Sequence, residues 1–199
     1  NSINAIRGYL RYCRNILNLN VLDPAKIFWC KVSERNVWFF NDGQKKLIKK
    51  AVNKWIWKKN ITQLRNKLLT YMLMNTGLRV HELAKIKVEE IWETLQIIGK
   101  WWKRRVVFLK KELLDMIDEY LSERKRNSEY LFDSTKEGKH LRESSIRRIY
   151  EQLTAKLWFH IHPHRFRHTF ATDLLHIHGS NIYNVAKLLG HKRITTTQI

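Results

Sequence analysis

Apolar residues recur at helical spacing along much of this chain. Between residues 2 and about 18, side chains such as Ile6, Leu10 and Cys13 fall three or four positions apart, which predicts one amphipathic helix. Asp23-Pro24 interrupts the pattern, and residues 24–38 predict a linker with isolated apolar positions.

The same spacing predicts a series of helices in the remainder of the chain. Asp42 is placed to cap the first of them, Gly77 to end the second, and Pro163 to begin another. They are expected over residues 43–58, from about 64 to 76, and over 80–86, 113–121, 146–153, 164–177 and 181–188.

Two short β-prone runs stand out between these helices. Residues 94–98 and 105–109 flank the sequence Gly99-Lys100-Trp101-Trp102-Lys103-Arg104, which predicts a hairpin with a basic turn. The expected fold class is therefore α+β, mainly α with a small antiparallel β-sheet.

The charge balance points to a polyanionic partner. Lys and Arg number 38 against 18 acidic residues, a formal net charge of +20, and nucleic acid relieves such repulsion best, with an anionic membrane surface second. No apolar run approaches the roughly 20 residues of a membrane span. The two cysteines, Cys13 and Cys30, favour a reducing interior, so we expect a cytoplasmic protein.

Candidate chemistry concentrates near the C-terminus, where His162-Pro163-His164 precedes Arg165-Phe166-Arg167-His168. If Pro163 begins a helix, His164 and Arg167 lie three residues apart and share a face. A fixed cation beside a titratable imidazole suits a group that handles a phosphate diester.

Four segments together resemble the catalytic domain of the tyrosine recombinases, the phage-integrase and Xer-like family. They are Thr76-Gly77-Leu78-Arg79-Val80-His81-Glu82-Leu83, Ile98-Gly99-Lys100, the His164/Arg167 helix, and Leu188-Leu189-Gly190-His191. The resemblance covers residues 38 to 199. It implies that residues 1–36 are the tail of an N-terminal core-binding domain with a linker, and that residues 37–199 are a catalytic domain.

The resemblance also implies roles for individual residues. Arg79 and Arg167 would hold the scissile phosphate, because guanidinium forks match phosphate geometry. Lys100 would be the general acid for the departing 5′ oxygen, His164 and His191 would assist proton transfer, and Glu82 would orient the cations nearby. Further contacts to DNA phosphates, partly from a solvated basic face at 103–105, are expected from Lys103, Arg104, Arg105, Arg142, Arg165 and Lys192.

The implied reaction is attack by a tyrosine on duplex DNA to give a 3′-phosphotyrosyl link, with strand exchange inside a tetramer. The ester conserves the bond energy, so neither ATP, metal nor another cofactor is expected. Thr196-Thr197-Gln198-Ile199 resemble the residues before that tyrosine, and the seven tyrosines of the chain lie in other contexts. We therefore expect the sequence as given to bind DNA without cleaving it.

Alternatives remain at several positions. Arg79 and Glu82 could form an ordinary ion pair, Lys100 could be a solvated turn lysine, and His191 could cap the helix that ends at Gly190. His160, His162, His164 and His168 admit a minor zinc interpretation. A type IB topoisomerase and a non-catalytic DNA-binding regulator are the alternative functions.

Overall fold

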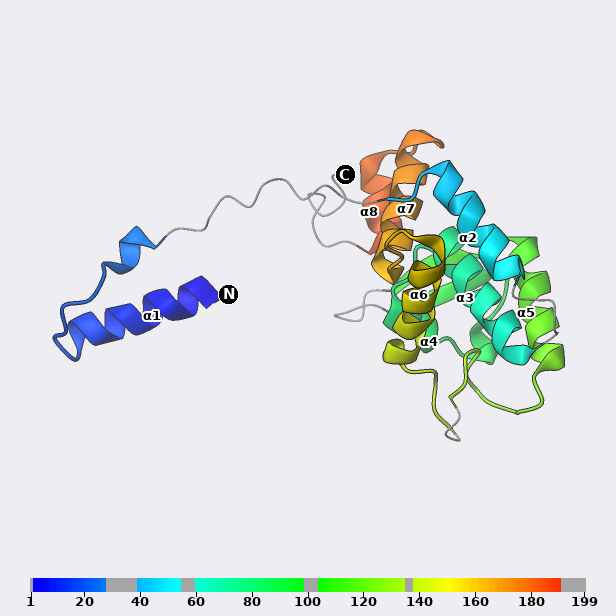
Figure 1. Ribbon diagram of the computed structural model, residues 1–199, viewed down its shortest axis with the longest axis horizontal. Helices are drawn as coiled ribbons and strands as arrows, with labels where there is room; N and C mark the ends of the chain where they lie inside the picture. The colour runs from blue at the N-terminus through cyan, green and yellow to red at the C-terminus, as the bar shows by residue number, and fades with distance from the viewer. Residues whose placement is uncertain (1, 28–38, 55–59, 99–103, 135–137, 191–199) are drawn as a thin grey trace. The chain divides into compact units, whose positions relative to one another are not determined.

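The computed structural model describes residues 2–27, 39–54, 60–98, 104–134 and 138–190 (Figure 1). The chain divides into two compact units, Asn1–Asn36 and Val37–Ile199. Each unit is described by itself.

The first unit contains helix α1, Ser2–Asn15, and a short 3-10 helix η1, Pro24–Lys26. Cys13 and Pro24 are buried in it, and the guanidinium Nε of Arg7 donates to the carbonyl of Ile27 at 3.0 Å. Asp23 caps η1 by accepting the backbone N–H of Ala25 at 2.9 Å. The predicted first helix is confirmed.

The second unit is built mainly from helices, and each predicted helix is found. They are α2 (Asp42–Lys54), α3 (Ile61–Thr76), α4 (Val80–Ala84), α5 (Lys111–Glu123), α6 (Glu143–Leu157), α7 (Pro163–His176) and α8 (Ile182–Leu189). The predicted continuation of α2 beyond Lys54 lies outside the described residues.

Helix α3 forms the centre of this unit and packs against α2, α5 and α7 (Figure 1). Leu68, Leu69 and Met72 have no exposed surface, so α3 is apolar on more than one side, as expected of a helix enclosed by others. Phe166 of α7 stacks against Phe40 and Tyr150, with ring centroids 4.9 and 5.2 Å away. This packing fixes α7 against the rest of the core.

The small sheet consists of the two antiparallel strands β1, Thr94–Ile98, and β2, Arg104–Phe108, with Ile97 opposite Arg105 and Leu95 opposite Val107. Alternate residues point inward, and Leu95 and Val107 enter the core. A 3-10 turn, η3 (Val88–Glu90), precedes β1. The predicted class, mainly α with a small antiparallel sheet, is confirmed.

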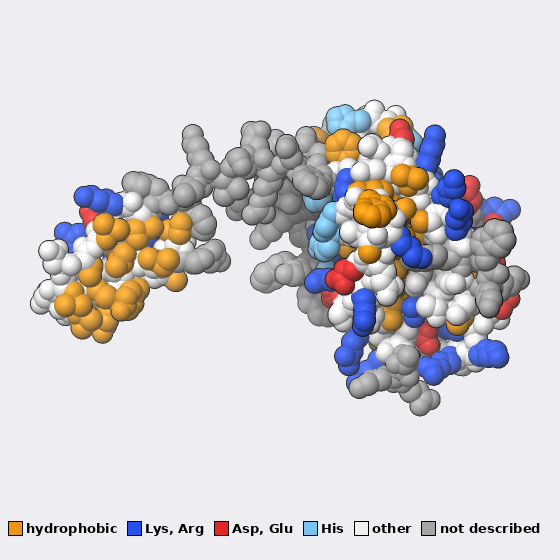
Figure 2. Space-filling view, viewed as in Figure 1, with side chains coloured by type: hydrophobic (Ala, Val, Ile, Leu, Met, Phe, Trp, Pro, Cys, Tyr) orange, Lys and Arg blue, Asp and Glu red, His pale blue; other side chains and the backbone are white. Residues whose placement is uncertain are grey.

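Lys and Arg side chains are distributed over the face of the second unit that Figure 2 presents. Within the described parts of the chain, no helix is long and apolar enough to cross a membrane.

Candidate active site

The turn between α3 and α4 places Arg79. Helix α3 ends at Gly77, whose φ of 60° is left-handed, and Arg79 is the residue before α4. A Cβ on Gly77 would lie 2.5 Å from Cδ1 of Phe170, which is too close for any carbon contact. Position 77 therefore requires glycine for its backbone conformation and for its space.

Glu82 is the centre of a charged cluster beside this turn. Its carboxylate accepts hydrogen bonds from the Arg79 backbone N–H at 2.8 Å and from Arg79 Nη1 at 3.0 Å. It also accepts hydrogen bonds from both terminal nitrogens of Arg105, at 2.7 and 2.5 Å, so the two side chains form a bidentate pair. One carboxylate thus orients two guanidinium groups from different elements.

Burial and charge oppose each other at Glu82. Burial raises the pKa of this carboxyl, but the Arg105 and Arg79 hydrogen bonds and charges outweigh it and lower the pKa to about 2. Glu82 is therefore ionised at any working pH, although its side chain is only 2% exposed.

Arg167 lies on α7 with 6% of its surface exposed. Its Nη1 donates to the carbonyl of Gly77 at 2.6 Å, and its Nη2 donates to the carbonyl of Leu189. These carbonyls belong to the ends of α3 and α8, where helix dipoles favour a cation. Burial, followed by the charge of Arg79, lowers the pKa of Arg167 to about 9, so it stays charged at neutral pH.

His164 lies one turn before Arg167 and is exposed. Burial of its ring is the main factor that lowers the pKa of His164, and the charges of His168, Arg147, Arg167 and Arg79 lower it further. The imidazole therefore lies within electrostatic reach of both arginines and is kept neutral near pH 7.

Four residues predicted for the site, Arg79, Glu82, His164 and Arg167, thus converge from the α3–α4 turn, α4 and α7. An ammonium or imidazole beside them would complete a pocket for one phosphate group. The predicted residues Lys100, Lys103, His191 and Lys192 lie outside the described residues.

Comparison with protein families gives a match over nearly all of this unit. The family described as the phage integrase family matches residues 40–199, which is most of the chain. The chain belongs to the phage integrase family.

Individual relatives agree with this membership. The chain is 37% identical over 142 residues to tyrosine recombinase XerA of Pyrococcus horikoshii, an alignment that covers 68% of this chain and 50% of that protein. It is 35% identical over 147 residues to tyrosine recombinase XerC of Leptospira interrogans, covering 70% of this chain and 47% of that protein. The chain spans about half the length of these curated relatives.

Solved structures of recombinases share the fold. A crystal structure of XerH recombinase bound to palindromic difH, after cleavage, matches with a TM-score of 0.72 at 25% identity. The match covers 87% of this chain and 51% of the XerH chain. A crystal structure of XerA recombinase has a TM-score of 0.68 at 24% identity and covers 97% of this chain and 68% of its own.

The structure corrects one prediction about the basic hairpin of this integrase-family chain. Arg105 was expected on a solvated basic face, but its side chain is 8% exposed and is bound to Glu82. It lies opposite Ile97 and two residues from Val107, on the inward side of the hairpin. Alternation along β2 contained this signal, because Val107 and Leu109 mark the buried side.

Arg165, which was predicted to contact DNA, also makes several contacts within the protein. Its guanidinium donates to the carbonyl of His160 at 2.6 Å and to that of Phe39 at 3.0 Å, and it lies 4.3 Å from the centre of the Phe40 ring. It therefore ties the start of α7 to the chain before α2. Arg104 and Arg142 are exposed, and their contact with DNA phosphates stays a prediction.

Histidines near α7 do not converge as metal ligands would. In the part of the chain that the structure describes, no group of three or more His, Cys, Asp or Glu side chains is placed to hold a metal ion. The rings of His160, His162 and His164 are instead stacked, with centroids 6.0 and 5.3 Å apart.

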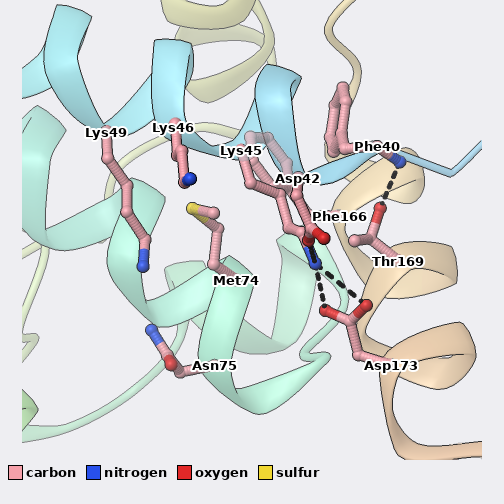
Figure 3. A pocket seen from close by; sticks show the side chains of 10 residues that line it. All are labelled: Phe40, Asp42, Lys45, Lys46, Lys49, Met74, Asn75, Phe166, Thr169 and Asp173. Atoms are coloured by element: carbon pink, nitrogen blue, oxygen red, sulfur yellow. Dashed lines mark hydrogen bonds and ion pairs between the residues drawn. The ribbon is translucent and has the colours of Figure 1, made fainter. Parts of the chain in front are cut away.

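A separate cavity of about 350 Å³ lies between α2, α3 and α7 (Figure 3). Lys45 crosses it and pairs with Asp42 at 2.8 Å and with Asp173 at 3.1 Å, which links α2 to α7. Lys46, Lys49 and Asn75 extend toward the same space. Among the described residues, none of those predicted for the active site lines this cavity, and we interpret the Lys45–Asp173 pair as structural.

Proposed function

We propose that this protein is the catalytic part of a site-specific DNA recombinase that cleaves and rejoins duplex DNA through a 3′-phosphotyrosyl intermediate. The observation that carries the proposal is the convergence of Arg79 and Arg167 beside the ionised Glu82, with His164 within electrostatic reach of both arginines. Relatives at 35–37% identity are tyrosine recombinases, and one solved neighbour holds DNA after cleavage.

In this function, Arg79 and Arg167 hold the non-bridging oxygens of the scissile phosphate and stabilise the charge of the pentavalent transition state. Arg79 presents the accessible group, since its side chain is 29% exposed. Glu82 and Arg105 keep its guanidinium in place before DNA arrives, so little reorganisation is needed at the moment of reaction.

The remaining roles follow the resemblance. Lys100 protonates the 5′ oxygen as it leaves, and His164 and His191 assist proton transfer. The nucleophile is a tyrosine contributed by the full-length protein, and four protomers assemble on two duplexes in the cytoplasm, at the nucleoid or, for a viral protein, in the host cell. Residues 1–36 belong to the preceding core-binding domain. Neither metal nor nucleotide enters this scheme.

The experiment uses the full-length protein and a pool of nicked duplexes with a randomised central region. We expect an SDS-resistant protein–DNA adduct linked through a 3′-phosphotyrosine. Arg167→Lys, which keeps a cation near the carbonyls of Gly77 and Leu189, should slow adduct formation by about 10²–10³-fold, the typical effect of losing one preorganised donor. Binding to duplex DNA should change little.

Arg124→Lys is the matched control. The Arg124 guanidinium also donates to backbone carbonyls, those of Ser128, Tyr130 and Leu131, but outside the candidate site. This variant should form adducts at the wild-type rate. An unchanged rate in Arg167→Lys would contradict the clamp. Binding without any adduct would support a DNA-binding regulator, and relaxation of supercoils without exchange between two sites would support a topoisomerase.

A further inference from the structure

Three histidine rings lie in a row along the segment that leads into α7. The rings of His160 and His162 are 6.0 Å apart with 20° between their planes, and those of His162 and His164 are 5.3 Å apart with 22°. The backbone at His162 is extended, with φ −131° and ψ 143°, so residues at alternate positions point to the same side. The three residues are called the histidine row below.

The histidine row extends along the surface from the candidate active site. His164, the member beside the site, lies within electrostatic reach of Arg79 and Arg167, and His160 is the member at the far end; both are exposed. His162 between them is partly buried, and its Nδ1 accepts the backbone N–H of His164 at 3.3 Å, which caps α7. A ligand held by the two arginines would therefore extend naturally along this row.

The charges that act on His162 and His164 are all cationic. Burial is the largest cause that lowers the pKa of His162, and the charges of His164, His160 and Arg147 lower it further. His168, Arg167 and Arg79 act in the same direction on His164, and Arg147 itself pairs with Glu143 at 3.5 Å. Burial and these neighbouring charges thus favour the neutral form of His162 and His164 in the free protein.

We propose that the histidine row binds the DNA phosphates next to the scissile one and takes up protons as the DNA binds. This inference rests on the proposed function, because it assigns a role to a surface beside the same site. Neutral imidazoles can donate one N–H each to phosphate oxygens. The phosphate charges oppose the repulsion from the arginines and from neighbouring rings, so an imidazolium becomes favourable only in the complex.

The experiment measures binding of a fluorescein-labelled duplex between pH 6 and pH 8, at constant salt and with EDTA present. By linkage, the association constant changes by about tenfold per pH unit for each proton taken up. We expect wild-type affinity to rise as the pH falls. His160→Gln together with His162→Asn should bind within about twofold of wild type at pH 8 and lose most of the pH dependence.

The two substitutions are chosen to preserve the fold. Asparagine is a strong N-cap residue and can replace the capping acceptor of His162. The side chain of His160 has no part in the cap, so His160→Gln alone provides the same comparison if the double variant is unstable. His176→Gln with His178→Gln is the matched control, since these two exposed histidines lie at the opposite end of α7. The control should keep the wild-type pH dependence.

Titration calorimetry in PIPES and in Tris, which have different ionisation enthalpies, counts the protons directly. Equal heats in both buffers, or an unchanged pH dependence in the His160/His162 variant, would overturn the inference while salt-dependent DNA binding still supported the proposed function. Failure of the wild-type protein to bind the duplex at any pH would overturn both.

Discussion

The carboxylate of Glu82 is enclosed by the cations that it orients. Its side chain is 2% exposed, that of Arg105 is 8% exposed, and Arg167 is buried close by. The pair is favourable only while both partners are present, because an isolated buried charge has neither water nor a counter-charge.

Replacement of Glu82 by glutamine should therefore destabilise the protein strongly. We expect the free energy of unfolding to fall by about 3–5 kcal/mol at pH 7, the usual cost of breaking a buried ion pair from one side. Urea unfolding followed by circular dichroism measures it. Glu89→Gln is the control, because Glu89 is 75% exposed and 3.8 Å from Lys87, and it should change stability by less than about 0.5 kcal/mol.

The same carboxylate predicts a pH dependence. The pKa of Glu82 is lowered from its ordinary 4.5 to about 2 in the folded protein, so the unfolded chain takes up the proton first. Its contribution, about 3 kcal/mol, is complete above pH 4.5 and is lost as the pH falls toward 2. Wild type should lose more stability than Glu82→Gln over this window. Parallel curves for the two proteins would contradict the assignment.

The members of the candidate site were easier to anticipate than their environments. The resemblance implied Arg79, Glu82, His164 and Arg167, and the three-residue spacing of His164 and Arg167 predicted one shared helix face because such spacing depends only on the local chain. The bond from Arg167 to Leu189 could not be predicted, since the two residues are 22 positions apart and meet only through the packing of α7 on α8. Arg105 was misplaced because its charge was given more weight than its position in the strand.

The ends of the helices position the side chains of the candidate site. Gly77 ends α3 and Gly190 ends α8, each in the left-handed region with φ of 60° and 67°. Both were predicted from their glycines. Trp158 ends α6 in the same conformation, with φ 62° and 94% of its surface exposed. Nothing in the sequence signalled this, because a side chain in that region costs about 1–2 kcal/mol and glycine normally occupies it.

Gly77→Ala tests how the end of α3 packs against α7. The substitution combines an unfavourable φ with a Cβ 2.5 Å from Phe170, so unfolding free energy should fall by about 3 kcal/mol or more. Gly138→Ala has a similar φ of 66° but nothing within 4 Å of its Cβ, and should cost only about 1 kcal/mol. The difference, measured by urea unfolding, isolates the contact with α7. Equal losses would mean that Phe170 moves aside without cost.

At the scale of the molecule, charge governs association. The chain carries a formal net charge of +20. Separately, the periodic pattern of apolar residues was sufficient to predict the helices and the small sheet. The chain divides into the units Asn1–Asn36 and Val37–Ile199, and the assignment of the first unit to a core-binding domain stays a prediction.

Binding to a duplex should therefore weaken steeply with salt. The log–log slope is about −0.9 for each phosphate contacted, and Arg142→Gln should make it shallower by about 1 if Arg142 meets a phosphate. Lys111→Gln is the control, since Lys111 is exposed at the start of α5, across α3 from α7 (Figure 1). Fluorescence anisotropy over a salt series measures both slopes. A slope that does not change in Arg142→Gln would remove this residue from the interface.

The inward orientation of Arg105 has a practical consequence for engineering. Libraries that randomise this strand should vary the exposed Arg104 and keep Arg105 fixed. Variants at position 105 would lose the partner that holds the Glu82 carboxylate, and with it the arrangement of the candidate site.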